Sequence, residues 1–257
     1  MDKKVLIIAG SDPSGGAGMQ ADMKTVQDFG GQAIFAITAI TAQNRERVLE
    51  IHPTPADVLT QQLSAACQGQ EIGSVKIGMV ATGANVHALV WFLQRLPIPH
   101  IVIDPVLYSS SGHSLLEKKS QQIFRQQLLP LATVITPNLP EASAFAGMQV
   151  NSVATMRTAA EIIYKETYSL RGGKSNLKPL AIIIKGGHLK GEAIDILYDG
   201  LEFSEFSSPR IAGISPRGTG CRFSSSIAAG LAKGQNLKQA VTAAKEYLGN
   251  YIRGSNV

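Results

Sequence analysis

The chain lacks most of the features that would assign it to a common class of protein at first sight. It has only two cysteines in 257 residues, Cys67 and Cys221, and these lie far apart without the spacing of metal ligands. The apolar run in its N-terminal stretch, MDKKVLIIAGSD, is too short for a signal peptide or a membrane span. We therefore expect a cytoplasmic protein with no membrane partner.

Charged residues are also scarce, at 17% of the chain, and the net charge of +5 is modest for this length. Lysine and arginine are scattered among acidic residues, so no basic stripe predicts binding to nucleic acid. A mild positive charge would suit an anionic small-molecule substrate, although chance explains it as well. The hydrophobic content of 44% is that of an ordinary globular protein, and no long linker or internal repeat divides the chain. We predict a single domain over residues 1–257.

Short apolar runs alternate with amphipathic stretches, which predicts a mostly parallel sheet with helices on both faces. Strands are expected at 5–9, 33–40, 75–79, 100–103, 132–135 and 180–184, and helices at 19–29, 54–66, 85–96, 221–233 and 237–251. Residues 194–198 and 201–206, joined by Asp-Gly, predict an antiparallel hairpin at one edge. We interpret Trp91 and Phe92 as packing residues of the helix at 85–96.

The first strand leads into a glycine-rich loop at 10–18, GSDPSGGAG. This loop is neither a dinucleotide fingerprint nor a P-loop, because no Gly-Lys-Ser/Thr follows it. Ligands of open α/β sheets bind beyond the carboxyl ends of the strands, which is where Ser11 and Asp12 would lie. A tight turn would explain one or two glycines, but not four glycines with three polar residues.

Several other strands also end in polar residues, namely Gln43, Asp104, Asn138, Glu141 and Lys185. Carboxylates can hold Mg²⁺ through its waters while a lysine neutralises phosphate charge, so this set suits metal–nucleotide chemistry. Gln43 is either a loop amide in water or the reader of a heterocycle's hydrogen-bonding edge. Charged residues at strand ends are often only solvated, but their recurrence at one edge of the sheet favours a site.

The site should be organised around residues 215–221, SPRGTGC, which precede the apolar run 227–231. The glycines let backbone amides approach a ligand, and the following helix offers unpaired amides and a positive dipole end to an anion. Cys221 would lie in that positive end, where a thiol ionises more easily. The alternative is a glycine-rich turn into a core helix, with Cys221 as a small buried hydrophobe, and this stretch alone does not separate the two.

The chain carries, in one order, the motifs AGSDPSGGAGMQADMKT, ITAITAQN, VKIGM, DPV, LLPLATVITPNLPEA, IIIKGGHL and GTGC. Together they resemble the hydroxymethylpyrimidine/phosphomethylpyrimidine kinases of thiamine biosynthesis over nearly the whole chain. The resemblance implies a ribokinase-like three-layer α/β/α fold and transfer of the ATP γ-phosphate to the hydroxymethyl group of an aminopyrimidine. It also implies a second phosphorylation of the monophosphate to the diphosphate, Mg²⁺ and a homodimer.

The resemblance also implies roles for single residues. The positions matching the family's catalytic residues are Gly218, Thr219 and Gly220 in an anion hole, Cys221 beside the reacting hydroxyl, and Lys185 on phosphate. Those matching the pyrimidine pocket are Gly10, Ala17, Asp22, Gln43, Met79 and Val106. The nucleotide side would comprise Asn138, Lys185 and Thr219, with Asp104 and Glu141 toward Mg²⁺. Cys221 could accept the hydroxyl proton if its pKa fell toward neutrality.

Some positions depart from the family pattern. Arg217 stands where the family usually has His before GTGC, and Arg222 where it usually has Thr after it. The two guanidiniums would add contacts to ATP or a phosphorylated substrate, or simply face solvent. The loop at 107–111 lacks the Lys or Thr that members often have, and the His-rich segment that often closes them is absent. The polar stretch 169–176 predicts a surface loop.

Two alternative functions stay open at this point. A pyridoxal or pyridoxine kinase of the same superfamily would phosphorylate a ring of similar size. Pyridoxal lacks the 4-amino pattern that Gln43 would read, so the relative turnover of the two rings distinguishes these kinases. A non-catalytic ligand-binding or regulatory protein is the other alternative, and the presence of all the expected polar residues argues against it.

Overall fold

The computed structural model describes residues 3–44, 46–109, 112–172, 178–189, 191–211 and 217–254. Some sequence predictions fall partly outside these ranges. They concern the end of the loop after Val106, residues 173–176 of the stretch 169–176, the residues Ser215 and Pro216, and the last three residues of the chain.

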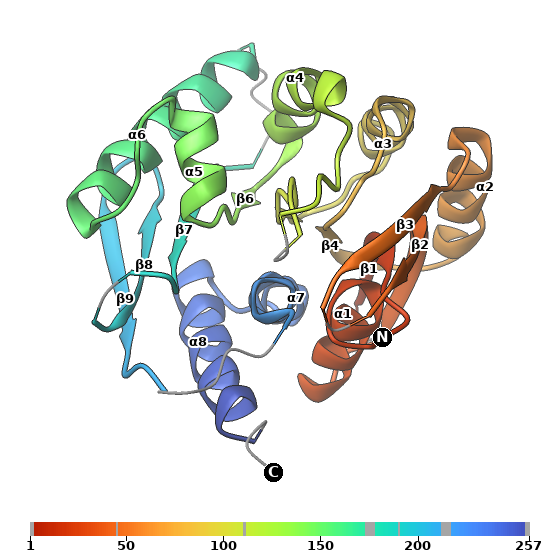
Figure 1. The fold of residues 1–257 in the computed structure, drawn as a ribbon. Coiled ribbons are helices and arrows are strands. Elements are labelled where there is room, and N and C mark those ends of the chain that lie inside the picture. The colour runs from red at the N-terminus through yellow and green to blue at the C-terminus, as the bar shows by residue number, and fades with distance from the viewer. Residues whose placement is uncertain are drawn as a thin grey trace.

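A nine-stranded sheet forms the centre of the molecule, with strand order β3-β2-β1-β4-β5-β6-β7-β8-β9 (Figure 1). Its strands are β1 Lys4–Ser11, β2 Ala33–Gln43, β3 Val48–Pro53, β4 Ile72–Ile77, β5 Ile101–Ile103, β6 Val134–Ile135, β7 Ala181–Gly186, β8 Ala193–Tyr198 and β9 Phe203–Ser208. Pairing is parallel from β2 through β7 and antiparallel between β7, β8 and β9. The predicted mostly parallel sheet and its edge hairpin are confirmed.

The opposite edge holds an antiparallel strand that the sequence analysis missed. Strand β3 pairs with β2, and a bulge interrupts their register near Gln43. Most of its side chains are exposed, including Leu49 at 57%, so the strand shows neither a continuous apolar run nor a clean alternation. Edge strands with one partner and little burial carry a weak sequence signal.

Helices cover both faces of the sheet, as predicted (Figure 1). One face carries α1 Gly18–Asp28, α7 Thr219–Ala232 and α8 Leu237–Gly254. The other carries α2 Ala56–Cys67, α3 Gly83–Leu93, the short α4 Gln121–Ile123, α5 Leu139–Ala146 and α6 Val153–Leu170. Short 3₁₀ and π turns over Lys118–Ser120, Phe124–Leu128 and Leu129–Leu131 flank α4. No helix in the described residues is long and apolar enough to cross a membrane.

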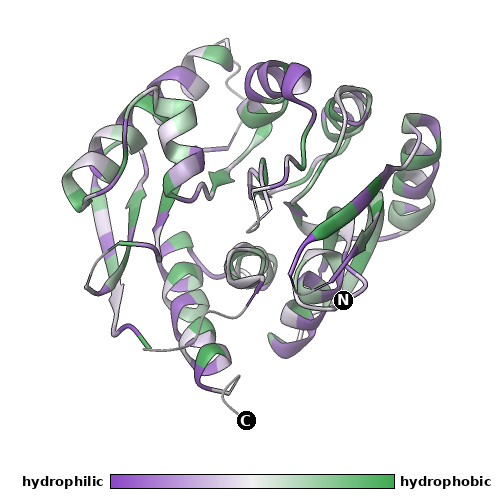
Figure 2. Ribbon diagram, in the orientation of Figure 1, coloured by the Kyte–Doolittle hydropathy of each residue, from purple (hydrophilic) through white to green (hydrophobic). Residues whose placement is uncertain are grey.

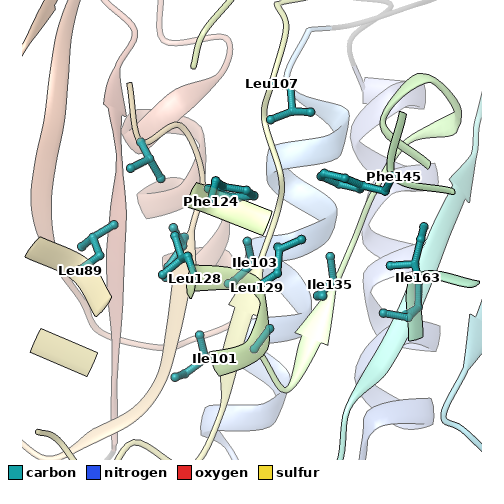
Figure 3. Close-up of a cluster of buried hydrophobic side chains, with 14 of the residues drawn as sticks. Leu89, Ile101, Ile103, Leu107, Phe124, Leu128, Leu129, Ile135, Phe145 and Ile163 are labelled. Carbon is teal, nitrogen blue, oxygen red and sulfur yellow. The ribbon is translucent and has the colours of Figure 1, made fainter. Parts of the chain in front are cut away.

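Two hydrophobic cores lie on the two faces of the sheet because successive side chains of a strand point to opposite sides. In β1, Leu6 and Ile8 join the core under α2, α3 and α6, whereas Val5 and Ile7 join the core under α1 and α7. Figure 3 shows part of the first core, and Figure 2 shows that the covering helices carry both apolar and polar residues.

The prediction for Trp91 was wrong, while that for Phe92 is confirmed. Trp91 is 49% exposed, and the guanidinium of Arg95 stacks 4.1 Å from its ring centroid. Phe92 is only 5% exposed and packs in the first core. Neighbouring positions on a helix point about 100° apart, so the stripe that buries Phe92 turns Trp91 toward solvent.

Candidate active site

A buried ion pair lies where three parallel strands end side by side. Asp104 follows β5, and Lys185 lies near the end of β7, with β6 between them. Lys185 Nζ is 2.5 Å from Asp104 Oδ1, which also accepts a hydrogen bond from Thr136 Oγ1 at 3.2 Å. Burial opposes ionisation of Asp104, but Lys185 and Lys76 outweigh it and lower the pKa of this carboxyl. The pair is therefore charged at neutral pH.

Asn138 and Glu141 stand beside this pair and also begin helix α5. Asn138 Oδ1 accepts from the Glu141 amide at 2.9 Å, and Glu141 Oε2 accepts from the Asn138 amide at 2.8 Å. This reciprocal capping box is a structural role that the sequence analysis did not recognise, although its spacing was readable. Burial, with the negative charge of Asp104, raises the pKa of Glu141 to about 7, and Lys185 offsets this only in part.

The turn before helix α7 packs on the same ion pair. Gly218 is the N-cap residue with φ +73°, and a Cβ there would lie 2.1 Å from the Gly16 carbonyl oxygen. Only glycine combines this backbone conformation with such a close approach. A Cβ at Gly220 would lie 3.1 Å from Lys185 Nζ, so the first turn of α7 rests against the lysine. The unpaired amides of a helix N-terminus and a buried cation thus meet at one point.

Cys221 does not have the ionisation behaviour that its helix position predicted. Desolvation raises the pKa of its thiol to about 11, although the positive charge of Lys76 acts in the opposite direction. The carboxylates of Asp22 and Asp104 add to the upward shift. The free-energy cost of removing a thiolate from water at this position exceeds the electrostatic stabilisation that the helix N-terminus and Lys76 provide. Cys221 is therefore a neutral thiol at neutral pH.

A second buried ion pair lies beneath the first turns of α1 and α7. Asp22 Oδ2 is 2.6 Å from Lys76 Nζ, and Asp22 Oδ1 accepts from Ser225 Oγ at 2.8 Å, with both charged side chains fully buried. Burial raises the pKa of Asp22. Burial lowers that of Lys76, but Asp22 more than compensates, so its pKa shifts upward. The Asp22 carboxylate is thus already partnered. Lys76 was not predicted as a site residue, because its only signal in the sequence is a charge inside an apolar strand.

The remaining pyrimidine-pocket positions lie at the carboxyl ends of β1, β2, β4 and β5. Gly10 approaches the buried Met79 so closely that a Cβ on Gly10 would lie 2.9 Å from Met79 Sδ. The Ala17 amide donates to Asp12 Oδ2 at 2.9 Å, which closes the glycine-rich loop. Gln43 ends β2, and Val106 lies two residues after Asp104 with its amide on the Asp104 carbonyl.

The two arginines that flank the GTGC motif have different surroundings. Arg222 is only 4% exposed; its guanidinium stacks 4.1 Å from the Tyr251 ring centroid and lies 3.5 Å from Thr25 Oγ1. The expectation that it contacts a ligand or faces solvent was therefore wrong, because the helix turns this position toward α1 and α8. Arg217 instead reaches the end of β2, where it donates to Gln43 Oε1 at 3.3 Å.

Comparisons with known proteins agree with this arrangement. The model of the phosphomethylpyrimidine kinase family matches residues 12–257. The chain belongs to this family. It is 40% identical over 251 residues to the hydroxymethylpyrimidine/phosphomethylpyrimidine kinase of Aquifex aeolicus, covering 97% of this chain and 94% of the relative. It also matches the chloroplastic thiamine biosynthetic bifunctional enzyme of Arabidopsis thaliana with 40% identity, spanning 97% of this chain and 46% of that protein.

Solved structures place the kinase among ribokinase-like proteins. The phosphomethylpyrimidine kinase of Clostridium difficile 630 superposes with a TM-score of 0.82 at 35% identity, over 97% of this chain and 99% of that one. The ADP complex of Bacillus subtilis pyridoxal kinase superposes with a TM-score of 0.83 at 36% identity, over 96% and 90%. The predicted fold is confirmed, and the enzyme is a phosphotransferase.

Proposed function

We propose that this kinase transfers the γ-phosphoryl group of ATP to 4-amino-5-hydroxymethyl-2-methylpyrimidine and then phosphorylates the monophosphate to the diphosphate, in thiamine biosynthesis. The observation that carries the proposal is the convergence of the turn 218–221 with the Lys185–Asp104 pair. The names of the relatives support the substrate. We further propose that residues 1–257 form one domain and act as a homodimer. A cytoplasmic location stays a prediction of the sequence.

The proposed chemistry follows from what phosphoryl transfer requires. Its transition state is loose, so catalysis depends on alignment and charge neutralisation more than on covalent chemistry. Backbone amides of Gly218, Thr219 and Gly220 would donate to the equatorial oxygens of the phosphoryl group. Lys185 supplies a positive charge against the same turn, and the α7 dipole adds to it. These groups would stabilise the charge that is redistributed during transfer.

The residues present also fit a magnesium–nucleotide complex. Within the described ranges, no group of three His, Cys, Asp or Glu residues is placed to hold a metal by itself. Mg²⁺ usually keeps several waters and binds through one or two carboxylates plus substrate phosphates, so Asp104 and Glu141 suffice. Their carboxylates are near enough for Asp104 to raise the pKa of Glu141, a repulsion that a cation would relieve. Bound Mg²⁺ would neutralise phosphate charge.

Asn138, Lys185 and Thr219 would contact the nucleotide. Support for ATP comes from relatives of known structure, which include a pyridoxal kinase of Staphylococcus aureus in complex with AMP-PCP.

We assign Cys221 the role of a proton acceptor that contributes less than the anion hole. With a pKa of about 11 the thiol is almost entirely protonated at neutral pH, so only the small thiolate fraction could accept the hydroxyl proton. A loose transition state develops little charge on the attacking hydroxyl, so early removal of its proton contributes little to the rate. The substrate ring would lie against Gln43, Met79 and Val106, near Gly10 and Ala17 and above the buried Asp22.

Pyridoxal kinase activity is the second candidate, and a specific observation favours it. The structure of the Staphylococcus aureus pyridoxal kinase with AMP-PCP and pyridoxal superposes with a TM-score of 0.84 at 32% identity, over 98% of this chain. The phosphomethylpyrimidine kinase of Clostridium difficile superposes to a similar extent, with a TM-score of 0.82 at 35% identity. The overall fold therefore does not indicate which of the two rings the enzyme phosphorylates, so selectivity between them must come from the pocket residues.

The deciding experiment is a product analysis with ATP, Mg²⁺ and each candidate alcohol. The enzyme is incubated separately with the aminopyrimidine, its monophosphate and pyridoxal, and the products are identified by phosphorus NMR and mass spectrometry. We expect the monophosphate and then the diphosphate of the aminopyrimidine. Phosphorylation of pyridoxal alone would replace the proposal with the second candidate, and the absence of any transfer would refute both.

A further inference from the structure

Arg217 joins three segments that meet at the proposed substrate pocket. Arg217 directly precedes the N-cap residue of α7, and a Cβ placed on Gly16 would lie 3.5 Å from the Cβ of Arg217. Its guanidinium then spans to the end of β2, where Nη1 donates to the Asn44 carbonyl and Nη2 donates to Gln43 Oε1 at 3.3 Å. No carboxylate pairs with it within the described ranges. The arginine thus connects the glycine-rich loop, the turn before α7 and Gln43.

The bond to Gln43 determines which way the Gln43 amide faces. A guanidinium carries only donors, so its partner on the glutamine must be the carbonyl oxygen Oε1 and never the Nε2 amide nitrogen. An isolated glutamine can rotate its amide by 180° to exchange donor and acceptor. Arg217 opposes that rotation, because the flipped amide would set an N–H group against the guanidinium and lose the bond. Oε1 keeps a second lone pair for a ligand, and Nε2 keeps both of its hydrogens.

The amide orientation matters because the two candidate rings present different edges. When their hydroxymethyl groups coincide, the 4-amino group of the aminopyrimidine occupies the place of the pyridoxal aldehyde. The adjacent pyrimidine nitrogen then occupies the place of the carbon that bears the pyridoxal hydroxyl. The pyrimidine edge offers a donor beside an acceptor, which matches Oε1 and Nε2 of one fixed amide. The pyridoxal aldehyde would set an acceptor against Oε1, so it fits only after the amide rotates.

We propose that Arg217 is a specificity-determining positioning residue, which holds Gln43 in the amide orientation that accepts an aminopyrimidine and disfavours pyridoxal. This inference rests on the proposed function. It differs from a direct contact with substrate or ATP, because Arg217 acts on selectivity through Gln43. Substrate choice between two rings of similar size would then depend on a residue beside the anion hole.

The test compares two variants with the wild-type enzyme. Arg217→Met removes the hydrogen-bond donors, and Arg217→Lys keeps the positive charge without the planar, two-nitrogen donor geometry of the guanidinium. The matched control is Arg95→Met, because Arg95 also donates to a backbone carbonyl at the surface but lies two residues after the end of α3, a helix on the opposite face of the sheet from α7. For each protein we would measure kcat/KM for the aminopyrimidine and the inhibition constant of pyridoxal against it. The inhibition constant makes selectivity measurable even where pyridoxal is not phosphorylated. Thermal melting checks folding.

We expect Arg217→Met to lower selectivity for the aminopyrimidine about three- to tenfold, the scale of one hydrogen bond. Arg217→Lys should fall between this variant and the wild type, while Arg95→Met and the KM for ATP should not change. In a Gln43→Leu background, adding Arg217→Met should have no further effect on selectivity, since the arginine acts through the amide. That non-additivity is a readout that a merely structural role would not produce.

Three results would overturn the inference. They are unchanged selectivity in Arg217→Met, a full further loss in the double variant, or a raised KM for ATP in place of altered selectivity. Wild-type enzyme that leaves the aminopyrimidine unphosphorylated would instead refute the proposed function, and the inference with it. Wild-type enzyme that prefers the aminopyrimidine, with an Arg217→Met variant that keeps the same preference, would refute the inference alone.

Discussion

A side chain at Gly220 would enter the space between the N-terminus of α7 and the buried Lys185–Asp104 pair. Its Cβ would lie 3.1 Å from Lys185 Nζ and 4.0 Å from Asp104 Oδ2. The first distance is tighter than ordinary van der Waals contact, and the lysine is held by Asp104 at 2.5 Å. The two methyl groups of a valine would extend further into this space. Gly220→Val should therefore displace both the cation and the amides of the turn.

The expected loss of turnover in Gly220→Val follows from the number of hydrogen-bond donors that the valine would displace. Loss of one preorganised donor in an anion hole lowers turnover roughly 100- to 1000-fold. Because Gly220→Val would misplace several donors together, we expect turnover to fall at least about 1000-fold, or about 4 kcal/mol of transition-state stabilisation. Folding should be retained, since Gly220 has no positive φ and valine is a better helix former than glycine.

The assay is turnover at saturating ATP and alcohol, together with thermal melting of the same samples. Gly249→Val is the matched control, because Gly249 also lies within a helix and its nearest added contact is the flexible Arg253 side chain at 3.5 Å. The control should keep wild-type turnover and stability. A Gly220→Val enzyme that melts like the wild type and turns over at its rate would refute the assignment of this turn as the anion hole.

Three further predictions concern other residues of the site. Cys221→Ser should keep measurable turnover, and a rapid-quench experiment should trap no phospho-cysteine, because in the described part of the chain no His-Asp pair of the kind that activates a nucleophile accompanies the thiol. A covalent intermediate would contradict this. Gln43→Leu should reduce kcat/KM for the aminopyrimidine about ten- to a hundredfold with little change in the KM for ATP, since an unpaired polar edge costs about 1–3 kcal/mol; unchanged pyrimidine kinetics would exclude the assignment. Glu141 has a folded-state pKa of about 7, above its ordinary 4.5, so its contribution to stability is complete below about pH 4.5 and is lost as pH rises through about 7. In the presence of a chelator, the unfolding free energy of the wild type should therefore fall by roughly 3 kcal/mol relative to that of Glu141→Gln between about pH 4.5 and 7, as measured by urea unfolding. Parallel pH profiles of the two proteins would contradict the raised pKa.

The parts of the site that the sequence predicted are those encoded locally. Asp104, Asn138 and Lys185 stand directly at the ends of apolar strands, and parallel neighbours bring such ends to one edge. Gly218 and Gly220 predict a turn into a helix, because few residues other than glycine adopt the backbone conformations of such a turn. Strand β3 carried too little burial to be predicted, and the capping role of Glu141 was overlooked beside its functional one.

By itself the sequence determined the alternation of strands and helices, the position of the glycine-rich turns and the chemical types at the strand ends, since these depend on neighbours in the chain. Tertiary structure alone decided that Lys76 pairs with Asp22, 54 residues away, and that Arg222 is buried against α8. It also decided that the Cys221 thiol is neutral and that Arg217 reaches Gln43. Charge pairing and pKa depend on desolvation and on groups brought together from distant segments, and local sequence records neither.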